Sequence, residues 1–424
     1  MSEEKLRILK MLEEGKITAQ DAENLLRALG GSPEEAFDLH GGFGRHFRDK
    51  MHARMYAKMA RVNPGRIVAE VMREVNPGEI VSKVMESVGG AMQEWDFEFP
   101  GKGRKQAEEE QTLEFSCIKH VELTNLRGDV KVAGGRMPDS GCRITVDKIT
   151  WGESEEEAQE RLGNIQVIAD KDGDFLKVKV EGGPWTRKLH AQVDFEIEVP
   201  MSCDLIVNVA KGDLEVQGVS GEIGLKAASG DIKMKACSGK ADLSTANGDI
   251  DIEEFSGEGL AAATINGDMK AEDLSAQVAL SSVSGDISAK NVSGGLLKVS
   301  SVSGSIALKG FQNQAVEILA QSGDVEMEEG QSPDVKSSSV SGDVQAELAP
   351  MDGTLAIRST SGDVDLTLGK DTDAQVECET MSGDIEVDMS IQKTLESERK
   401  FRGVLGTGKG RIRVSTTSGD ISLH

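Results

Sequence analysis

Aromatic side chains are scarce in this chain. They make up 4% of its 424 residues, and the three tryptophans and the single tyrosine all lie before residue 211. A groove that cleaves acidic polysaccharides uses aromatic surfaces to hold the sugars, so the second half of the chain is a poor candidate for that chemistry. Hydrophobic residues reach 38% and glycine occurs 48 times. The core that this composition allows consists of thin layers of small and aliphatic side chains.

The usual markers of catalysis are missing as well. No histidine lies between His190 and His424, and neither a phosphate-binding glycine loop nor a paired nucleophile and base is recognisable. We therefore expect no enzymatic activity, no catalytic, cofactor-binding or metal-binding residues, no cofactor and no small-molecule substrate.

An excess of positive charge is also absent, because the formal net charge is -25. Nucleic acid is disfavoured as a partner, since phosphate binding needs a basic surface. The chain contains no uninterrupted apolar run of about 18 residues, the length that spans a bilayer.

Cysteine usage and the N-terminus bear on the compartment. The five cysteines are widely spaced without a Cys-x-x-Cys pair, which argues against a disulfide framework and a zinc site and predicts buried thiols in a reducing compartment. The opening Met1-Ser-Glu-Glu-Lys is typical of a charged helix rather than a signal peptide. The expected location is the cytoplasm, with peripheral attachment at the inner face of the membrane as one option; surface exposure stays open.

Residues 1–31 are predicted to form a helical hairpin. Gly15 ends the first helix, and Thr18 is a suitable N-cap for the second. Two helices this short cannot bury their apolar faces alone, so we expect them to pack on another copy, another domain or a partner. The apolar stripes contain Leu6, Leu9, Leu12, Leu25, Leu26 and Leu29.

Residues 32–100 are predicted to form amphipathic helices. Basic residues lie among the apolar ones, and an Asn-Pro-Gly start occurs at residue 63 and again at residue 76. Two interpretations stay open: ordinary helix packing, or contact with an anionic membrane surface or a partner protein. The apolar positions are Met51, Met55, Met59, Ile67, Val71, Met72, Ile80, Val84 and Met85.

Residues 101–111 form a predicted polar linker, and residues 112–210 are rich in β-strand patterns without a repeat. One helix is expected within them, over Ser154 to Leu162. This segment is expected to cover one end of the repeats that follow.

From residue 211 to 424 a repeat dominates the sequence. A Gly-Asp step at Gly212 recurs every 18 to 21 residues, with Gly304-Ser305 as a variant. Self-similarity of this length is typical of a solenoid, and a weaker echo near the middle of each repeat indicates two strands per coil. We therefore predict a mainly β protein, a parallel β-helix with right-handed winding favoured, and a small α-helical N-terminal region.

Alternation fixes which side chains of the coils point inward. The first inward column starts with Ile232 and Ile250 and ends with Ile385; the second, two residues later, starts with Met234 and ends with Val387. Aligned aliphatic columns indicate parallel, in-register coils about 4.8 Å apart.

The aspartates of the Gly-Asp steps then point outward, in a column where neighbouring charges repel. Two explanations are open: the aspartate accepts backbone N–H bonds at a corner where glycine takes a positive φ, or the column binds cations such as calcium. The outward face turns acidic towards the C-terminus, where a cation or a basic partner is favoured. This candidate face contains Asp324, Glu326, Asp343, Asp363, Asp365, Asp384 and Glu386.

These motifs carry a resemblance. The Ser-Gly-Asp-Ile/Val coils, the strand from Asp194 to Pro200 and the ending "GKGRIRVSTTSGDI" resemble the bacterial "putative adhesin" β-helix family of YvlB/LiaX-like proteins. The opening "EEKLRILKMLEEGKITAQDAENLLRALG" resembles a SHOCT-like helical hairpin. The resemblance implies a β-helix linked to cell-envelope stress, often beside phage-shock-type membrane proteins, and it implies no catalytic residues.

The leading hypothesis is a non-enzymatic scaffold or sensor for envelope stress. Its helical N-terminus would dock on a membrane or a partner protein, and its solenoid would act as a rigid interaction rod. One alternative is a structural polymer that assembles through open solenoid ends. Another is a surface adhesin or a calcium-dependent binder.

Overall fold

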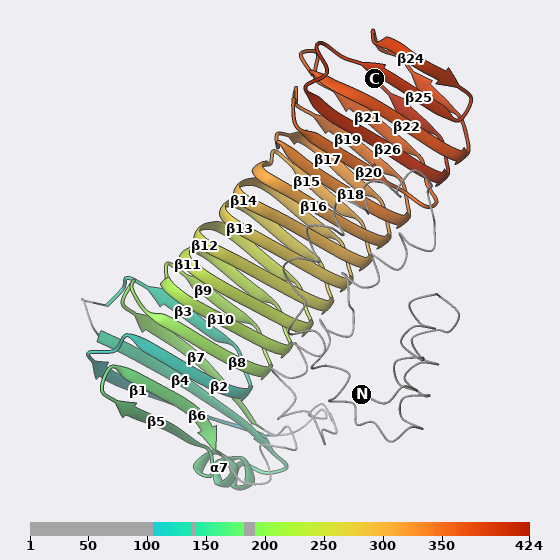
Figure 1. Cartoon of the computed structure of the whole chain (residues 1–424). Coiled ribbons are helices and arrows are strands. Elements are labelled where there is room, and N and C mark those ends of the chain that lie inside the picture. Colours follow the sequence, from blue (N-terminus) through green and yellow to red (C-terminus); the bar gives the residue numbers. More distant parts are fainter. Residues whose placement is uncertain (1–104, 138–140, 182–190) are drawn as a thin grey trace, which may run out of the picture. The chain divides into compact units, whose positions relative to one another are not determined.

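The computed structural model describes residues 105–137, 141–181 and 191–424, all of which belong to one compact unit, Asn63–His424. The predicted helical hairpin and the predicted amphipathic helices lie outside the described residues. The described part forms a single 27-stranded arrangement in which most neighbouring strands are parallel (Figure 1).

The middle of the chain is the predicted parallel β-solenoid. Each coil pairs in register with the next, so that Ile232 faces Ile250 and Ile250 faces Met269. The elements, in chain order, are β8 (Asp204–Lys211), β9 (Leu214–Gln217), β10 (Ser220–Ser229), β11 (Ile232–Asn247), β12 (Ile250–Asn266), β13 (Met269–Ser284), β14 (Ile287–Ser303), β15 (Ile306–Lys309), β16 (Gln312–Ser322), β17 (Val325–Gly330), β18 (Asp334–Ser341), β19 (Val344–Leu348), β20 (Thr354–Arg358) and β21 (Val364–Leu368).

The predicted inward columns form the core. Stacked aliphatic side chains fill it, and the completely buried aromatic residues among the described ones include Phe195, Phe255 and Phe311. Each such side chain contributes about 1.5–3 kcal/mol relative to an exposed position. Ile385 and Val387, which end the predicted columns, are only half-buried. The confirmed members are Ile232, Ile250, Met269, Ile287, Ile306, Val325, Val344 and Val364, with Met234, Ile252, Ala271, Ala289, Leu308, Met327, Ala346 and Leu366 beside them.

The stack begins earlier than the predicted start at residue 211. Strand β2 pairs in parallel with β8, and β3 pairs in parallel with β9, so residues 120–134 already form a coil. The coil escapes prediction because its neighbour in space comes some 80 residues later in the chain. Outside it, β4 pairs antiparallel with β7, and β5 pairs antiparallel with β6. The elements are β2 (His120–Arg127), β3 (Val130–Gly134), β4 (Gly141–Gly152), β5 (Gln166–Asp172), β6 (Phe175–Glu181) and β7 (Ala191–Val199).

The predicted linker over 101–111 is wrong from Lys105 onward, where β1 (Lys105–Ser116) begins and pairs antiparallel with β4. Its glutamates are compatible with a strand because β1 is the outermost strand of the sheet, and charged side chains are common on edges. The expected helix over Ser154 to Leu162 is α7 (Glu155–Gly163), whose N-cap Ser154 accepts a hydrogen bond from the Glu157 N–H at 3.2 Å.

The C-terminal end departs from chain order. Strand β26 lies between β20 and β22, and β27 lies between β21 and β23, with parallel pairing on both sides. The hairpin of β24 and β25 then covers the outer edge of β22 through antiparallel pairing. The elements are β22 (Ala374–Ser382), β23 (Ile385–Val387), β24 (Gln392–Ser397), β25 (Lys400–Val404), β26 (Gly410–Ser418) and β27 (Ile421–Leu423).

This order corrects the expectation that the coil ending at His424 leaves an open solenoid end. The last strand of the chain is an interior rung, and the Ile421 and Leu423 side chains are fully buried. At both ends of the described stack the outermost strands include antiparallel, charged ones, a common protection against edge-to-edge association. The hairpin covers only the edge of β22, while among the described strands β23 pairs with β27 alone, so the polymer alternative stays untested.

A tight loop connects the hairpin to β26. The Asp373 carboxylate accepts hydrogen bonds from the backbone N–H groups of Thr407, Gly408 and Lys409 at 2.7, 2.6 and 3.2 Å, and from the Thr407 hydroxyl at 2.8 Å. These bonds, the Thr407 hydroxyl first, lower the pKa of Asp373 to about 2. On β22, Glu377 accepts bonds from both Arg402 and Arg413, so it ties the hairpin and the inserted strand together.

We expect Asp373→Asn to loosen this loop at neutral pH. Because the folded pKa of Asp373 lies below its unfolded value of about 3.9, its stabilisation is present above that value and is lost as the pH falls through about 2. Hydrogen exchange of residues 400–424 between pH 5 and pH 2 measures this loss, which the variant should no longer show. Asp371→Asn, an exposed neighbour with the same change in charge, is the control. An identical pH response in the wild type and in Asp373→Asn would contradict the prediction.

Candidate interaction surface

The Gly-Asp step forms one corner of every coil. Gly248 has a φ of 155°, and a Cβ atom there would lie 2.1 Å from the Gly230 carbonyl oxygen of the coil before. The same overlap recurs between successive coils, so the corners stack with the glycine backbones in contact. Only glycine satisfies both the conformation and the space.

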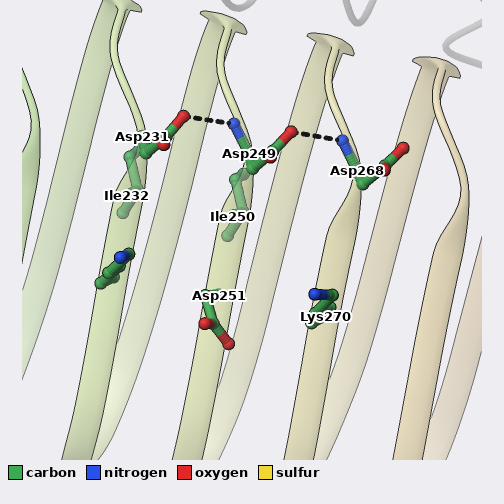
Figure 2. Close-up of a pocket in the computed structure, with 8 residues that line it drawn as sticks. Asp231, Ile232, Asp249, Ile250, Asp251, Asp268 and Lys270 are labelled. Carbon is green, nitrogen blue, oxygen red and sulfur yellow. Dashed lines mark hydrogen bonds between the residues drawn. The ribbon is translucent and has the colours of Figure 1, made fainter.

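The aspartates of these corners form a ladder. The Asp231 Oδ1 accepts the backbone N–H of Asp249 at 2.9 Å, and the Asp249 Oδ1 accepts that of Asp268 at 2.8 Å (Figure 2). The prediction that the aspartate accepts backbone N–H bonds is confirmed, and the donor lies in the next coil rather than in the same corner. In stacking order the ladder contains Asp194, Asp129, Asp213, Asp231, Asp249, Asp268, Asp286 and Ser305, and then Asp324, Asp343, Asp363, Asp420 and Asp384.

The hydrogen bonds of the ladder explain why aspartates in neighbouring coils can lie so close together. Each backbone N–H that is donated to a carboxylate offsets part of the repulsion between the charges. It also occupies one oxygen of each accepting aspartate with a bond that the fold needs. In the described part of the chain, no three His, Cys, Asp or Glu side chains form a group suited to a metal ion. The cation explanation therefore gains no support from the geometry.

Beside the ladder, the outward column of the early coils alternates in charge. Strand pairing places Lys131, Glu215, Lys233, Asp251 and Lys270 next to one another in that order. Figure 2 shows Asp251 and Lys270 on neighbouring strands below the ladder. Glu215, Lys233 and Asp251 therefore each lie between two opposite charges, and the charges of this column largely cancel.

The same column is different in the late coils. It continues as Glu326, Gln345, Asp365, Ser422 and Glu386, so acidic and neutral side chains alternate. Successive carboxylates are two coils apart, roughly 9–10 Å. This is close to the Debye length of about 10 Å at 0.1 M salt, so their mutual repulsion is small. Gln345 on β19 separates Glu326 from Asp365, and Ser422 on the inserted β27 separates Asp365 from Glu386.

All seven residues of the predicted acidic face are exposed, but the structure divides them. Asp324, Asp343, Asp363 and Asp384 belong to the ladder and hold neighbouring coils together. Glu326, Asp365 and Glu386 lie on the outward column, with the His424 Nε2 3.8 Å from the Asp365 Oδ1. We call these three residues the acidic column.

Sequence reasoning missed three members of the ladder. Asp129 and Asp420 each follow a glycine, as Gly128-Asp129 and Gly419-Asp420, so the same two-residue step could have identified them. Asp194 follows no glycine and gave no such signal; burial raises the pKa of its carboxyl, which accepts the Asp129 N–H at 2.8 Å.

Comparison with known families fits this architecture. The Toastrack DUF4097 model matches residues 176–277 and 266–424, which together are more than half of the chain. This chain belongs to the Toastrack DUF4097 family. The earlier resemblance to an adhesin-type β-helix family is thereby confirmed. A SHOCT-like domain model matches residues 3–34 of this Toastrack chain, as its opening residues predict.

Solved structures similar to the Toastrack chain are remote. A "putative cell adhesion protein" from Clostridium sporogenes has 9% identity and a TM-score of 0.20, covering 75% of this chain and 99% of its own. A "putative lipid binding protein" from Parabacteroides distasonis has 9% identity and a TM-score of 0.30, covering 75% and 96%. A "putative adhesin" from Bacteroides fragilis has 11% identity and a TM-score of 0.28, covering 74% and 97%. We draw no functional conclusion from them.

No curated protein matches the chain. Among the residues of the Toastrack chain that the structure describes, no helix has the length and apolar character needed to cross a membrane.

Proposed function

We propose that this Toastrack protein is a non-enzymatic interaction scaffold in the bacterial cell-envelope stress response. Its solenoid binds a basic protein partner through the acidic column, and its helical N-terminus docks on a membrane or on a partner protein. The observation that carries the proposal is the acidic column itself. Glu326, Asp365 and Glu386 are exposed, regularly spaced and outside the aspartate ladder.

The distribution of charge supports a basic partner. The outward column of the early coils alternates in sign, whereas the acidic column presents three carboxylates at intervals of roughly 9–10 Å. A basic helix with a cation every seventh residue rises about 10.5 Å between them, since each residue adds about 1.5 Å. Such a partner can place one cation opposite each carboxylate.

The N-terminal part of the proposal draws on the sequence. The SHOCT-like match covers residues 3–34, and a basic, methionine-containing stretch follows it. A basic amphipathic segment of this kind suits an anionic surface on the cytoplasmic side of the membrane or a groove on a phage-shock-type membrane protein. Together these features favour a cytoplasmic protein attached peripherally at the inner face.

A binding experiment tests the role of the acidic column. We expect the full chain to bind a helical peptide with lysine at every seventh position, and the variant Glu326→Gln/Asp365→Asn/Glu386→Gln to bind it about tenfold more weakly, because exposed ion pairs contribute about 0.2–1 kcal/mol each. Isothermal titration calorimetry at low and moderate salt measures both affinities.

The matched control removes the same number of charges from the early coils. Glu215→Gln/Asp251→Asn/Glu272→Gln changes the net charge equally but leaves the acidic column intact. It should lower the affinity by less than twofold. Equal losses in the two variants would show that only the net charge matters, and they would contradict the proposed site.

A further inference from the structure

The segment 410–424 occupies a slot between two coils that precede it in the chain. On one side β26 pairs with β20 and β27 with β21; on the other side β26 pairs with β22 and β27 with β23. Ile412, Val414 and Ile421 are completely buried there. The end of the chain thus completes the interior of the stack rather than its tip (Figure 1).

The strands on both sides of the slot precede its occupant in the chain. Residues 369–373 connect β21 to β22 and leave room for one coil between them, which β26 and β27 fill. The hairpin of β24 and β25 also comes before β26 in the chain. Until residues 410–424 are in place, the edges of β20 and β22 facing the slot have unpaired backbone N–H and C=O groups. Such edges are templates for pairing with any strand of matching pattern, from the same chain or from another.

The slot is selective for a coil of this type. A Cβ atom at Gly419 would lie 2.2 Å from the Gly362 carbonyl oxygen, and one at Gly383 would lie 2.2 Å from that of Gly419, so the occupant needs glycine at this corner. An aspartate as the next residue continues the ladder, because the Asp420 Oδ1 accepts the Asp384 N–H at 2.8 Å while the Asp420 N–H donates to Asp363 at 2.8 Å. The C-terminal segment of a second copy meets every one of these requirements.

Only the loop 405–409 decides which copy supplies the segment. All contacts inside the slot are the same whether the segment comes from the same chain or from another, so the balance depends on this loop and on concentration. The loop is held by Asp373, as described above, which favours the closed form.

We propose that residues 410–424 are exchanged between copies of this protein, giving a dimer in which each slot is filled by the C-terminal segment of the other chain. This contact is separate from the acidic column and its basic partner. It gives the scaffold a defined way to pair two solenoids near their C-terminal ends while their early coils stay unchanged.

Cross-linking across the slot tests the exchange. Gln375 and Arg411 are exposed neighbours in register on β22 and β26. Full-length Gln375→Cys and Arg411→Cys chains, each with the exposed Cys117 changed to serine and with different tags, are mixed at high concentration and treated with a short bifunctional thiol reagent. The control pair is Asp251→Cys with Lys270→Cys, which are neighbours in register on the interior coils β12 and β13.

We expect at least tenfold more cross-linked heterodimer from the slot pair than from the control pair, and faster formation when Asp373→Asn loosens the loop. A slot pair that cross-links no more than the control pair overturns the proposal, as does a yield that Asp373→Asn leaves unchanged. A chain carrying both Gln375→Cys and Arg411→Cys should also cross-link internally in dilute solution, and failure to do so would overturn the assigned register.

Discussion

Gly248→Ala is expected to destabilise the solenoid by roughly 3 kcal/mol, a large effect for the addition of one methyl group. The φ of 155° at Gly248 is unfavourable for any residue with a Cβ atom. The added carbon would also lie 2.1 Å from the Gly230 carbonyl oxygen, which belongs to the backbone of the neighbouring coil. The strain can be relieved only by separating two coils, which would lengthen the ladder bond between Asp231 and Asp249.

Gly259→Ala is the matched control. Gly259 lies in the next half-coil on β12, has no positive φ of this kind, and a Cβ atom there would meet nothing closer than the Gln277 carbonyl oxygen at 3.8 Å. We expect Gly259→Ala to leave the free energy of unfolding unchanged or to raise it by up to about 1 kcal/mol, because alanine reduces the conformational freedom of the unfolded chain. Urea denaturation followed by circular dichroism compares the two variants. Equal stabilities would show that the corner relaxes without cost.

The corner explains why the sequence predicts the middle of the fold well. In coils such as β11, β12 and β13, every step needs glycine for the backbone, aspartate for the next coil and an aliphatic residue directly afterwards. Three local requirements repeat at almost constant spacing. A pattern that is both local and repeated can be recognised in one sequence without knowledge of the contacts.

The two ends of the stack were harder to predict for a physical reason. At each end a coil lies next to a segment that is distant in the chain: β3 pairs with β9, and β26 pairs with β20. Side chains alternate between the core and the outer face of a strand in the same way whichever strand lies next to it. This alternation therefore gives no information on the order in which the coils stack. The long gap from Gly383 to Gly419 was the available sign that the chain leaves the stack and returns.

The candidate site shows the same limit. The alternation of inward and outward residues along each strand predicts that these acidic side chains are exposed. Asp324, Glu326 and Asp365 are exposed in the structure. Their separation into ladder aspartates and the acidic column did not follow, because it depends on which backbone N–H lies beside each carboxylate. The placement of Ser422 between Asp365 and Glu386 depends on the stacking order.

Removal of residues 410–424 is expected to have the largest effect of all the changes considered. The deletion takes away Ile412, Val414, Ile421 and Leu423, all completely buried. At about 1.5–3 kcal/mol for each buried side chain, roughly 6 kcal/mol or more of stabilisation is lost, and two strand edges open. Glu377 also loses Arg413 as a partner, which leaves Arg402 as its remaining arginine.

The loss should stay local, because each coil of a solenoid contacts only its neighbours. Hydrogen exchange with mass spectrometry should show β22 to β25 unprotected in the shortened chain, while β11 to β14 keep their protection. Arg411→Ala in the full-length chain is the control, since Arg411 is exposed on the same strand. A loss of protection along the whole stack would mean that the solenoid unfolds as one cooperative unit. Protection that persists in β22 to β25 would mean that the outer coil stands without the inserted segment, and the slot would then be a gap that the fold tolerates.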